Sequence, residues 1–459
     1  MKQKRFLALL LTAVMVMGLV GCGKSSTEVN DTGNGKKTQE DSNTGGASQQ
    51  QQAQDEKEAV NLVVAWWGSQ TRNERFQSAL DLYCELNPHV TIETQTSGFN
   101  DHLTSMSAAA ASNQLPDLIM LQADYYDSYI QGELLVDLTP YIESDALNLS
   151  KVAENVINTG RVGDGIYGVC AGVNSPSVLY NKTLLDTNGI TIEDNMNLEQ
   201  FTAKCKEIYD KTGYKTFISN PGQMVELLLR AQGKVLYTSG KLGADGWEEL
   251  LPYYALLETG RTEGWLIDYG VTVGMEAAEE QPMVYGTTPE TSSWCSFYNS
   301  NQADAMQSAA PEGMELGLTT CPTDDVKASN YLRQAMSWCV PNQGNQAEEA
   351  VALLNWWTNS KEANEIIRGE PGVPISSQVV DEISPSLSEI QKKIFTYIND
   401  VVTPNSSQGN PPAAVGNAEV NNLINELHEK VYYGKVTAEE AAKELFDSGN
   451  SIMAQAANH

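Results

Sequence analysis

Histidine is scarce in this chain, and the motifs that usually mark metal or catalytic sites are missing. Only four histidines occur, each in polar or loop sequence, which predicts solvated surface groups. There is no H-E-x-x-H motif, no Walker loop and no G-x-S-x-G elbow. The sequence therefore offers no pattern for a metal site or a cofactor site, and we predict neither.

Basic residues are also few. Lysine and arginine total 29 against 59 aspartates and glutamates, so the formal net charge is −30. Nucleic-acid binding needs clustered basic side chains that displace counterions from phosphates, so this balance excludes that class of partner. It likewise disfavours binding to anionic lipid through a charged surface.

Seven cysteines are present, but none forms a C-x-x-C pair. Apart from Cys22, their neighbours are mostly apolar or small, which favours buried free thiols. Three disulfides stay open as the alternative, because the number of remaining cysteines is even. These cysteines are Cys84, Cys170, Cys205, Cys295, Cys321 and Cys339.

The apolar run near the N terminus, residues 6–20, is too short for a spanning helix, which needs about 20 residues. It follows three basic residues and leads into Leu19-Val20-Gly21-Cys22. This arrangement resembles a bacterial lipoprotein signal. The resemblance implies that residues 1–21 are a signal peptide and that Cys22 is lipidated. An ordinary cleaved signal with an incidental cysteine is the alternative.

Residues 22–58 then read as a tether, because polar residues and glycine dominate and cannot bury enough apolar surface to order the chain. The remaining body is roughly 400 residues long, beyond the range of one hydrophobic core. It opens with strands at 62–66, 90–94 and 118–121 that alternate with helical periodicity, with Asn73 as the expected cap of the first helix. This pattern predicts an α/β fold with a parallel sheet.

Residues 163–168 match G-x-G-x-x-G, but no apolar strand precedes them and no helix pattern follows. We interpret Asp164-Gly165 as a hairpin turn instead of a dinucleotide site.

Trp66 and Trp67 lie at the carboxyl end of the first strand, the edge where ligands bind in open α/β sheets. Successive strand side chains face opposite ways, so we expect at least one indole to line a cleft, where it suits the flat face of a sugar. The alternative is that both lie in the core. Asp124 follows the third strand in the same way, and Trp294 is a further aromatic candidate.

Several segments, in order along the body, resemble the family 1 extracellular solute-binding proteins, the maltodextrin-binding-like receptors of carbohydrate ABC importers. They are W-W-G at 66–68, L-P-D-L-I at 115–119, Y-I-Q-G-E-L-L-V-D-L at 129–138, D-G-I-Y-G at 164–168, V-L-Y-N-K-T-L-L at 178–185, G-V-P-I at 372–375 and G-K-V-T-A-E-E-A-A at 434–442.

The resemblance implies an α/β fold of two lobes, like periplasmic binding proteins, with hinge strands between them. We expect an N-lobe of residues 59–168 and 315–371 and a C-lobe of residues 169–314 and 372–459. It further implies a monomer that is lipid-anchored at the extracellular face of the cell membrane. This receptor would capture a carbohydrate and deliver it to ABC permease subunits.

Residue by residue, the resemblance assigns ligand binding to Trp66 or Trp67, to Asp124, and to Asn174, where maltodextrin binders carry an acid. The family's N-G-x-W turn is altered here at 286–289, with Trp294 several residues later. We therefore predict three stacking residues and three hydrogen-bonding residues: Trp66, Trp67 and Trp294, and Asp124, Asn174 and Glu290.

Two other classes of function stay open. A glycoside hydrolase needs two carboxylates about 5 to 9.5 Å apart, and 59 acidic residues do not exclude such a pair. A receptor for peptides, polyamines or metals is the other alternative, although scarce histidine disfavours metal.

Overall fold

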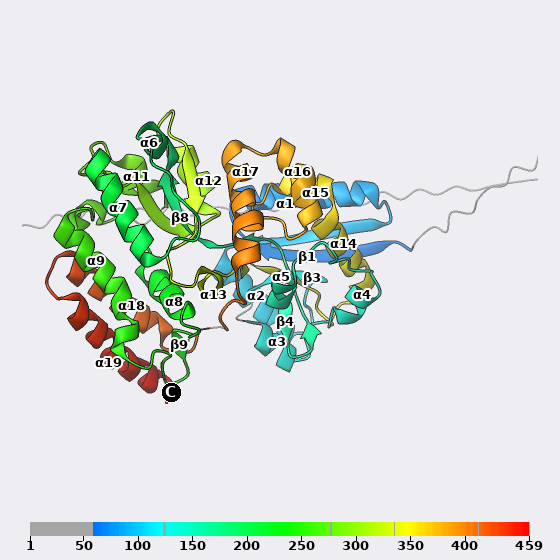
Figure 1. The fold of residues 1–459 in the computed structure, drawn as a ribbon. Helices are drawn as coiled ribbons and strands as arrows, with labels where there is room; N and C mark the ends of the chain where they lie inside the picture. Colours follow the sequence, from blue (N-terminus) through cyan, green and yellow to red (C-terminus); the bar gives the residue numbers. More distant parts are fainter. Residues whose placement is uncertain (1–57, 123–124, 276–277, 335, 412, 459) are drawn as a thin grey trace, which may run out of the picture. The chain divides into compact units, whose positions relative to one another are not determined.

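A computed structural model of the chain describes residues 58–122, 125–275, 278–334, 336–411 and 413–458 (Figure 1). The predicted signal peptide, Cys22 and the tether up to residue 57 lie outside the described residues, and so does Asp124. Among the helices in the described part, none combines the length and apolar character that a membrane crossing requires.

The first lobe is built on a five-stranded sheet in the order β2-β1-β3-β14-β6. β1 pairs in parallel with β2 and β3, whereas β14 is antiparallel to β3 and to β6. The strands are β1 Val60–Trp67, β2 Val90–Ser97, β3 Leu118–Leu121, β14 Ser337–Cys339 and β6 Val169–Cys170. The β-α-β-α-β opening that the periodicity predicts is thus confirmed.

Helices cover both faces of this sheet. Along β1, Val64 and Trp66 pack with Phe76 of α1, whereas Ala65 packs with Met106 of α2. The helices of this lobe are α1 Gln70–Leu86, α2 Phe99–Ala111, α3 Tyr126–Gln131, α4 Thr139–Glu143, α5 Glu154–Ile157, α14 Ala347–Asn359, α15 Lys361–Ile367 and α16 Ser377–Ile383. The predicted hairpin is confirmed, with β4 at Arg161–Val162 and β5 at Gly165–Ile166.

The second lobe has a three-stranded antiparallel sheet in the order β11-β8-β12, together with its own helical core (Figure 1). The strands are β8 Pro176–Asn181, β11 Cys295–Asn299 and β12 Leu316–Thr319. The main helices are α6 Lys182–Thr187, α7 Leu198–Thr212, α8 Pro221–Arg230, α9 Leu251–Glu263, α12 Gln302–Ala309, α18 Asn417–Tyr432 and α19 Ala438–Ala456. Capping boxes at Asn197 and Thr437 start α7 and α19.

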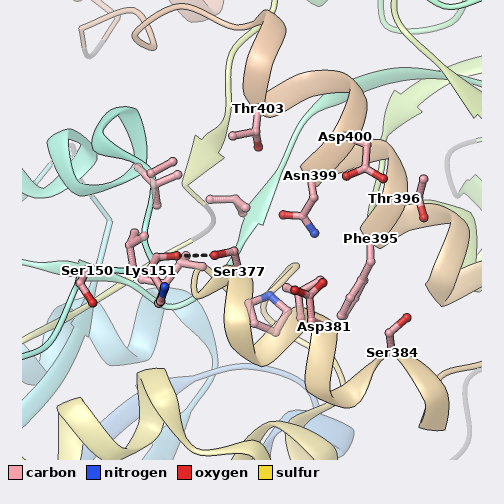
Figure 2. Close-up of a pocket in the computed structure, with 17 residues that line it drawn as sticks. Ser150, Lys151, Ser377, Asp381, Ser384, Phe395, Thr396, Asn399, Asp400 and Thr403 are labelled. Atoms are coloured by element: carbon pink, nitrogen blue, oxygen red, sulfur yellow. Dashed lines mark hydrogen bonds between the residues drawn. The ribbon is translucent and has the colours of Figure 1, made fainter.

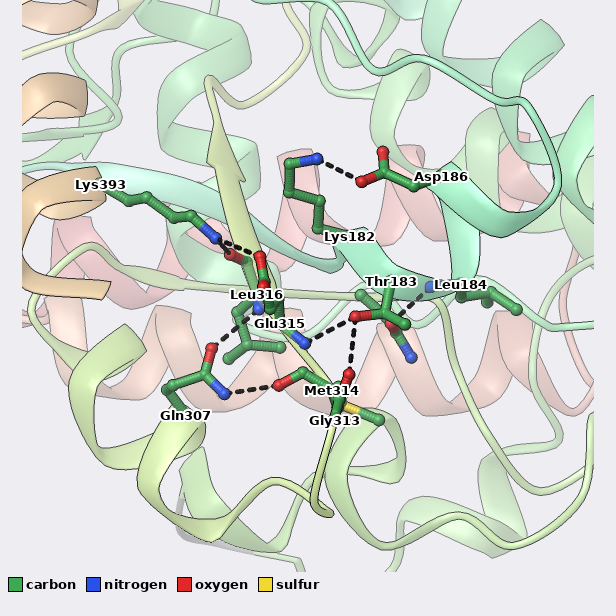
Figure 3. Close-up of polar contacts among 11 residues, drawn as sticks. Lys182, Thr183, Leu184, Asp186, Gln307, Gly313, Met314, Glu315, Leu316 and Lys393 are labelled. Atoms are coloured by element: carbon green, nitrogen blue, oxygen red, sulfur yellow. Dashed lines mark hydrogen bonds and ion pairs between the residues drawn. The ribbon is translucent and has the colours of Figure 1, made fainter. Parts of the chain in front are cut away.

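Helix α17 (Glu389–Thr396) is attached to the second sheet by polar contacts, which Figure 3 shows. The ammonium group of Lys393 donates to the Leu316 carbonyl at 3.0 Å and pairs with the Glu315 carboxylate at 3.2 Å. The Glu315 amide in turn donates to the Thr183 hydroxyl at 2.8 Å. These bonds connect α17, β12 and α6, and the π-helical turn Tyr397–Val402 continues α17.

The lobes are joined where segments from distant parts of the chain cross. β7 (Val173–Asn174) pairs with β13 (Arg333–Gln334), and Val173 exchanges two backbone hydrogen bonds of 3.0 Å with Val373. Gly172 and Gly372 meet at this crossing. A β-carbon at residue 372 would lie 2.8 Å from the carbonyl carbon of Gly172, and the φ of Gly372 is +138°.

The strands that pair in each sheet do not follow the lobe boundaries expected from the sequence. β6 at 169–170 belongs to the first sheet, and β12 at 316–319 still pairs with β8 in the second sheet. Ser376 forms a β-bridge with Val152, so the start of the expected second C-lobe segment contacts the first lobe. The expectation placed each crossing at a single residue, whereas hinge segments extend over several residues.

Two details of the sequence interpretation are wrong. Ser69 caps α1, because its hydroxyl accepts from the Arg72 amide, while Asn73 accepts from the indole of Trp66. His102 and His428 are buried, and the His428 ring bonds the Tyr253 hydroxyl at 2.6 Å. Burial lowers the pKa of His428 to about 3, so this histidine is a neutral core residue rather than a solvated one.

The six cysteines of the body remain thiols, and all except Cys84 are buried. The preference of the sequence for buried thiols over three disulfides is therefore confirmed at five positions.

We predict that Gly372→Ala lowers the free energy of unfolding by about 1–3 kcal/mol, because the new methyl group clashes with the backbone of Gly172 and the φ is unfavourable for alanine. Urea unfolding measures the change. Gly409→Ala is the matched control, because a β-carbon there lies 3.9 Å from its nearest neighbour, Tyr331. Equal stability of the two variants would contradict the importance of the crossing.

Candidate functional site

The two adjacent tryptophans of β1 are both buried, on opposite faces of the sheet. Trp66 is fully buried, packs against Phe76 and donates its indole N–H to Asn73 at 3.0 Å. Trp67 is 7% exposed and lies between Phe99 and His102, with ring centroids 5.3 and 5.2 Å away. Strand alternation does place the two rings on opposite faces of the sheet. Helices cover both of these sheet faces, so neither indole exposes its flat surface to a ligand in this structure.

Trp294 and Glu290 also lie away from the pockets described below. Trp294 is fully buried in the second lobe, where its indole N–H donates to the Thr216 hydroxyl at 2.8 Å. Glu290 is exposed, and hydrogen bonds from its own backbone amide and from Thr288 lower its pKa. The altered turn at 286–289 follows a short helix, α11 (Pro282–Tyr285), and no strand precedes it directly.

A pocket of about 560 Å³, lined by residues of the second lobe and by Arg333 of the hinge strand β13, has the chemistry that the sequence analysis sought elsewhere. Three half-buried tyrosines line it, together with five side-chain amides, one carboxylate and one guanidinium. We call it the tyrosine pocket. Its lining side chains are Tyr237, Tyr298, Tyr331, Asn220, Gln223, Asn299, Gln302, Asn421, Glu226 and Arg333.

Local backbone geometry brings these groups together. Asn220 adopts a left-handed conformation with φ of +53°, which starts α8 at Pro221 and places Gln223 at the pocket. Such a conformation is unfavourable for a residue with a side chain and is concentrated at functional sites. Gly222 permits the close approach of α18, because a β-carbon there would lie 2.0 Å from Oδ1 of Asn421. Asn299 ends β11 and accepts a hydrogen bond from Gln223 at 3.0 Å.

A buried arginine supports one wall of the tyrosine pocket. Arg230 is 5% exposed, and its guanidinium lies 4.7 Å from the ring centroid of Tyr331. It donates to the Ser329 carbonyl at 2.9 Å, to the Ser407 hydroxyl at 2.7 Å and to the Gln408 carbonyl at 2.9 Å, and it also bonds Asn410. These bonds hold residues 407–410 against the segment that precedes β13.

The ionisable groups of this pocket have shifted pKa values. Burial raises the pKa of Glu226, and the nearby Arg230 and a hydrogen bond from Asn410 partly offset this shift. Burial and the charge of Glu226 raise the pKa of Tyr237 to about 12. The tyrosine hydroxyl therefore stays protonated at neutral pH and can donate a hydrogen bond.

A second pocket, of about 260 Å³, lies where the lobes meet, and we call it the junction pocket. It is lined by Arg75 of α1, Asp304 of α12, Arg368 and, from the hinge, Asn174. Asn174 is buried, and its Oδ1 accepts no hydrogen bond from any described residue. Of the predicted site residues in the described ranges, Asn174 is the one that lines a pocket at the hinge.

A third pocket, of about 520 Å³, borders the hinge residues Val173 and Pro374 (Figure 2). Lys151, Asp381 and Asp400 lie at its rim and are exposed. Its one aromatic lining residue, Phe395, is buried. This pocket therefore offers less aromatic surface than the tyrosine pocket to a flat ligand.

The tyrosines that line the second-lobe pocket escaped the sequence analysis because they come from separate segments. Tyr237, Tyr298 and Tyr331 are each about 30 to 60 residues from the next, and no local motif connects them. One sequence signal could have indicated the pocket: the polar run Asn299-Ser300-Asn301-Gln302 directly follows an apolar strand. Ligands often bind at the carboxyl ends of strands, where the chain turns from a strand into a helix.

Comparison with known proteins gives a consistent result for the fold. A family model described as bacterial extracellular solute-binding protein matches residues 78–393. The extracellular solute-binding protein family 1 from Alicyclobacillus acidocaldarius has a similar structure, with a TM-score of 0.79 at 22% identity, covering 87% of this chain and 100% of that chain.

Two further solved structures are similar. One is the periplasmic oligogalacturonide-binding protein from Yersinia enterocolitica in complex with saturated digalacturonic acid, with a TM-score of 0.63, 17% identity and coverage of 86% and 99%. The other is the sugar-binding protein MalE from Xanthomonas citri, with a TM-score of 0.67, 14% identity and coverage of 86% and 98%. These likenesses confirm the predicted two-lobed α/β fold.

We predict that Arg230→Met lowers the free energy of unfolding by about 3 kcal/mol, because buried carbonyl acceptors lose their donor and the Glu226 carboxylate loses a nearby positive charge. Chemical unfolding of the variant measures the effect. Arg261→Met, at an exposed arginine of α9, is the control and should change stability by less than about 0.5 kcal/mol. Similar losses in both variants would show that the network around Arg230 contributes little.

Proposed function

The chain belongs to the bacterial extracellular solute-binding proteins, and on this premise we propose that it captures a sugar or oligosaccharide between its lobes and delivers it to an ABC importer. The observation that carries the proposal is the lining of the tyrosine pocket. Aromatic faces suit the C–H faces of sugars, and amides pair with hydroxyl groups as both donors and acceptors.

Asn174 extends the proposed site into the junction pocket. Its buried Oδ1 lacks a hydrogen-bond partner among the described residues, which costs about 1–3 kcal/mol. A sugar hydroxyl that donates to this oxygen would recover that cost. Asp124, which follows β3 in the sequence, remains a proposed hydrogen-bonding residue of the first lobe.

The proposed mechanism is closure of the hinge on the ligand. Asn174 belongs to β7 and Arg333 to β13, the paired segments that connect the lobes, so ligand contacts at these residues change with the angle between the lobes. A sugar that makes more contacts in the closed state shifts the equilibrium toward that state. The permease would then recognise the closed form.

We further propose that the protein acts without chemical change of its ligand and is anchored outside the cell through a lipid on Cys22. The tether, residues 22–58, would keep the body clear of the membrane while the anchor keeps it close to its permease. A surface glycoside hydrolase is the alternative, as is a receptor for a non-sugar solute such as a peptide or polyamine.

Calorimetric titration with a broad carbohydrate panel tests the sugar proposal, and at least one sugar should bind with micromolar affinity. Tyr298→Ala should weaken that affinity about 10- to 100-fold, because a stacking face is lost. Tyr433→Ala, at an exposed tyrosine of the second lobe, is the control and should bind normally. Binding of a peptide or polyamine and of no sugar would overturn the proposal, and release of shorter sugars on incubation would favour the hydrolase.

The anchor is tested separately with the full-length chain in a bacterial host that processes lipoproteins. We expect Cys22→Ser to prevent lipid attachment and release the protein from the membrane fraction, because serine lacks the thiol that carries the lipid. Cell fractionation and metabolic labelling with a fatty acid measure both effects. Cys84→Ser is the control, and retention of unlabelled Cys22→Ser protein in the membrane fraction would contradict lipid anchoring.

A further inference from the structure

Arginines gather at the hinge pockets of a chain that is otherwise strongly acidic. The described residues contain seven arginines, and five of them line the tyrosine and junction pockets or contact residues that do. No lysine lines either pocket. The five are Arg72, Arg75, Arg230, Arg333 and Arg368. In the junction pocket Arg75 and Arg368 lie with Asp304 and Glu370, and Glu370 pairs with Arg72 at 2.5 Å, so an unbalanced positive charge is found only at the tyrosine pocket of these two.

The charges at the tyrosine pocket do not cancel. Glu226 and Arg333 are the charged residues of its lining, and the buried Arg230 contacts the ring of Tyr331 and acts electrostatically on Glu226. Arg230 is the main cation acting on Glu226, and Arg333 is the weaker one. One carboxylate thus faces two guanidinium groups, so the site carries a net positive charge.

Arg333 supplies the surplus charge in an accessible position. Its side chain is exposed and lines the pocket, and it forms no hydrogen bond or ion pair with any side chain in the described ranges. It is directly paired with Asn174 across the β7–β13 ladder. Directly paired residues project from the same face of a ladder, so Arg333 of the tyrosine pocket and Asn174 of the junction pocket are neighbours.

Resting on the proposed sugar site, we propose that the preferred ligand is an acidic saccharide, and that Arg333 binds the carboxylate of one of its uronic acid units. A guanidinium holds a carboxylate through two parallel hydrogen bonds, which a neutral hydroxymethyl group cannot replace. The tyrosines and amides bind the ring and its hydroxyls, and Arg333 distinguishes acidic from neutral sugars. Arg230 acts on the ligand only indirectly, as a positioning residue that compensates Glu226.

The test is calorimetric titration of the purified full-length chain with digalacturonate and with disaccharides of glucuronate and mannuronate. Each acidic disaccharide is compared with its carboxyl-reduced, neutral counterpart. We expect at least one acidic sugar to bind more than tenfold tighter than its neutral counterpart, and this preference to shrink as salt is raised to about 0.5 M.

Arg333→Gln should reduce affinity for the acidic sugar about 10- to 100-fold and leave affinity for the neutral counterpart within about twofold. Arg333→Lys keeps the charge without the paired geometry and should give an intermediate loss. Arg261→Gln, at an exposed arginine outside the pockets, is the control. Thermal unfolding of each variant verifies that the fold is retained, and Arg333→Lys serves as the informative variant if Arg333→Gln is unstable.

The possible outcomes separate this inference from the proposed function. If neutral sugars bind as tightly as acidic ones, or if Arg333→Gln weakens both equally, the acidic class is wrong while sugar capture stands. If no saccharide of either kind binds, both proposals fail.

Discussion

The arrangement of the molecule depends on a backbone crossing in which two glycines, 172 and 372, lie closer than any side chain allows. Val173 and Val373 complete the crossing with reciprocal hydrogen bonds, and β13 pairs alongside. Because the sheets of both lobes continue directly from these segments, a change in this contact alters both pockets. The crossing and the proposed binding site therefore share one small region, in which Asn174 is both a strand residue and a pocket residue.

Local sequence patterns predicted the helices and strands well where the structure of a segment depends mainly on residues close to it in the sequence. The periodicity of residues 60–121 sufficed to predict three strands and the helices between them. The cap of α1 was misplaced because Asn73 is engaged by the indole of Trp66, a contact that no spacing rule contains.

The candidate site was less accessible to sequence reasoning. The alternation of side chains along β1 correctly predicted that Trp66 and Trp67 point in opposite directions. It could not predict that Phe76 packs on Trp66 and Phe99 on Trp67. The tyrosine pocket is assembled from five separate stretches of chain, and its charge depends on Arg230, which stacks on the lining residue Tyr331. Such properties arise from tertiary packing, so composition and motifs carry little information about them.

The sealed positions of the indoles have an optical consequence. Trp66, Trp265, Trp294 and Trp338 are fully buried, and the half-buried Trp247 and Trp356 line neither the tyrosine pocket nor the junction pocket, so the proposed recognition surface carries phenol rings instead. Tryptophan fluorescence, excited at the red edge of the absorption band where tyrosine does not absorb, would therefore report mainly on the interior of each lobe. It would respond only weakly to a bound ligand. A spectroscopic probe of occupancy in this protein belongs on the phenols or on a dye placed near the hinge.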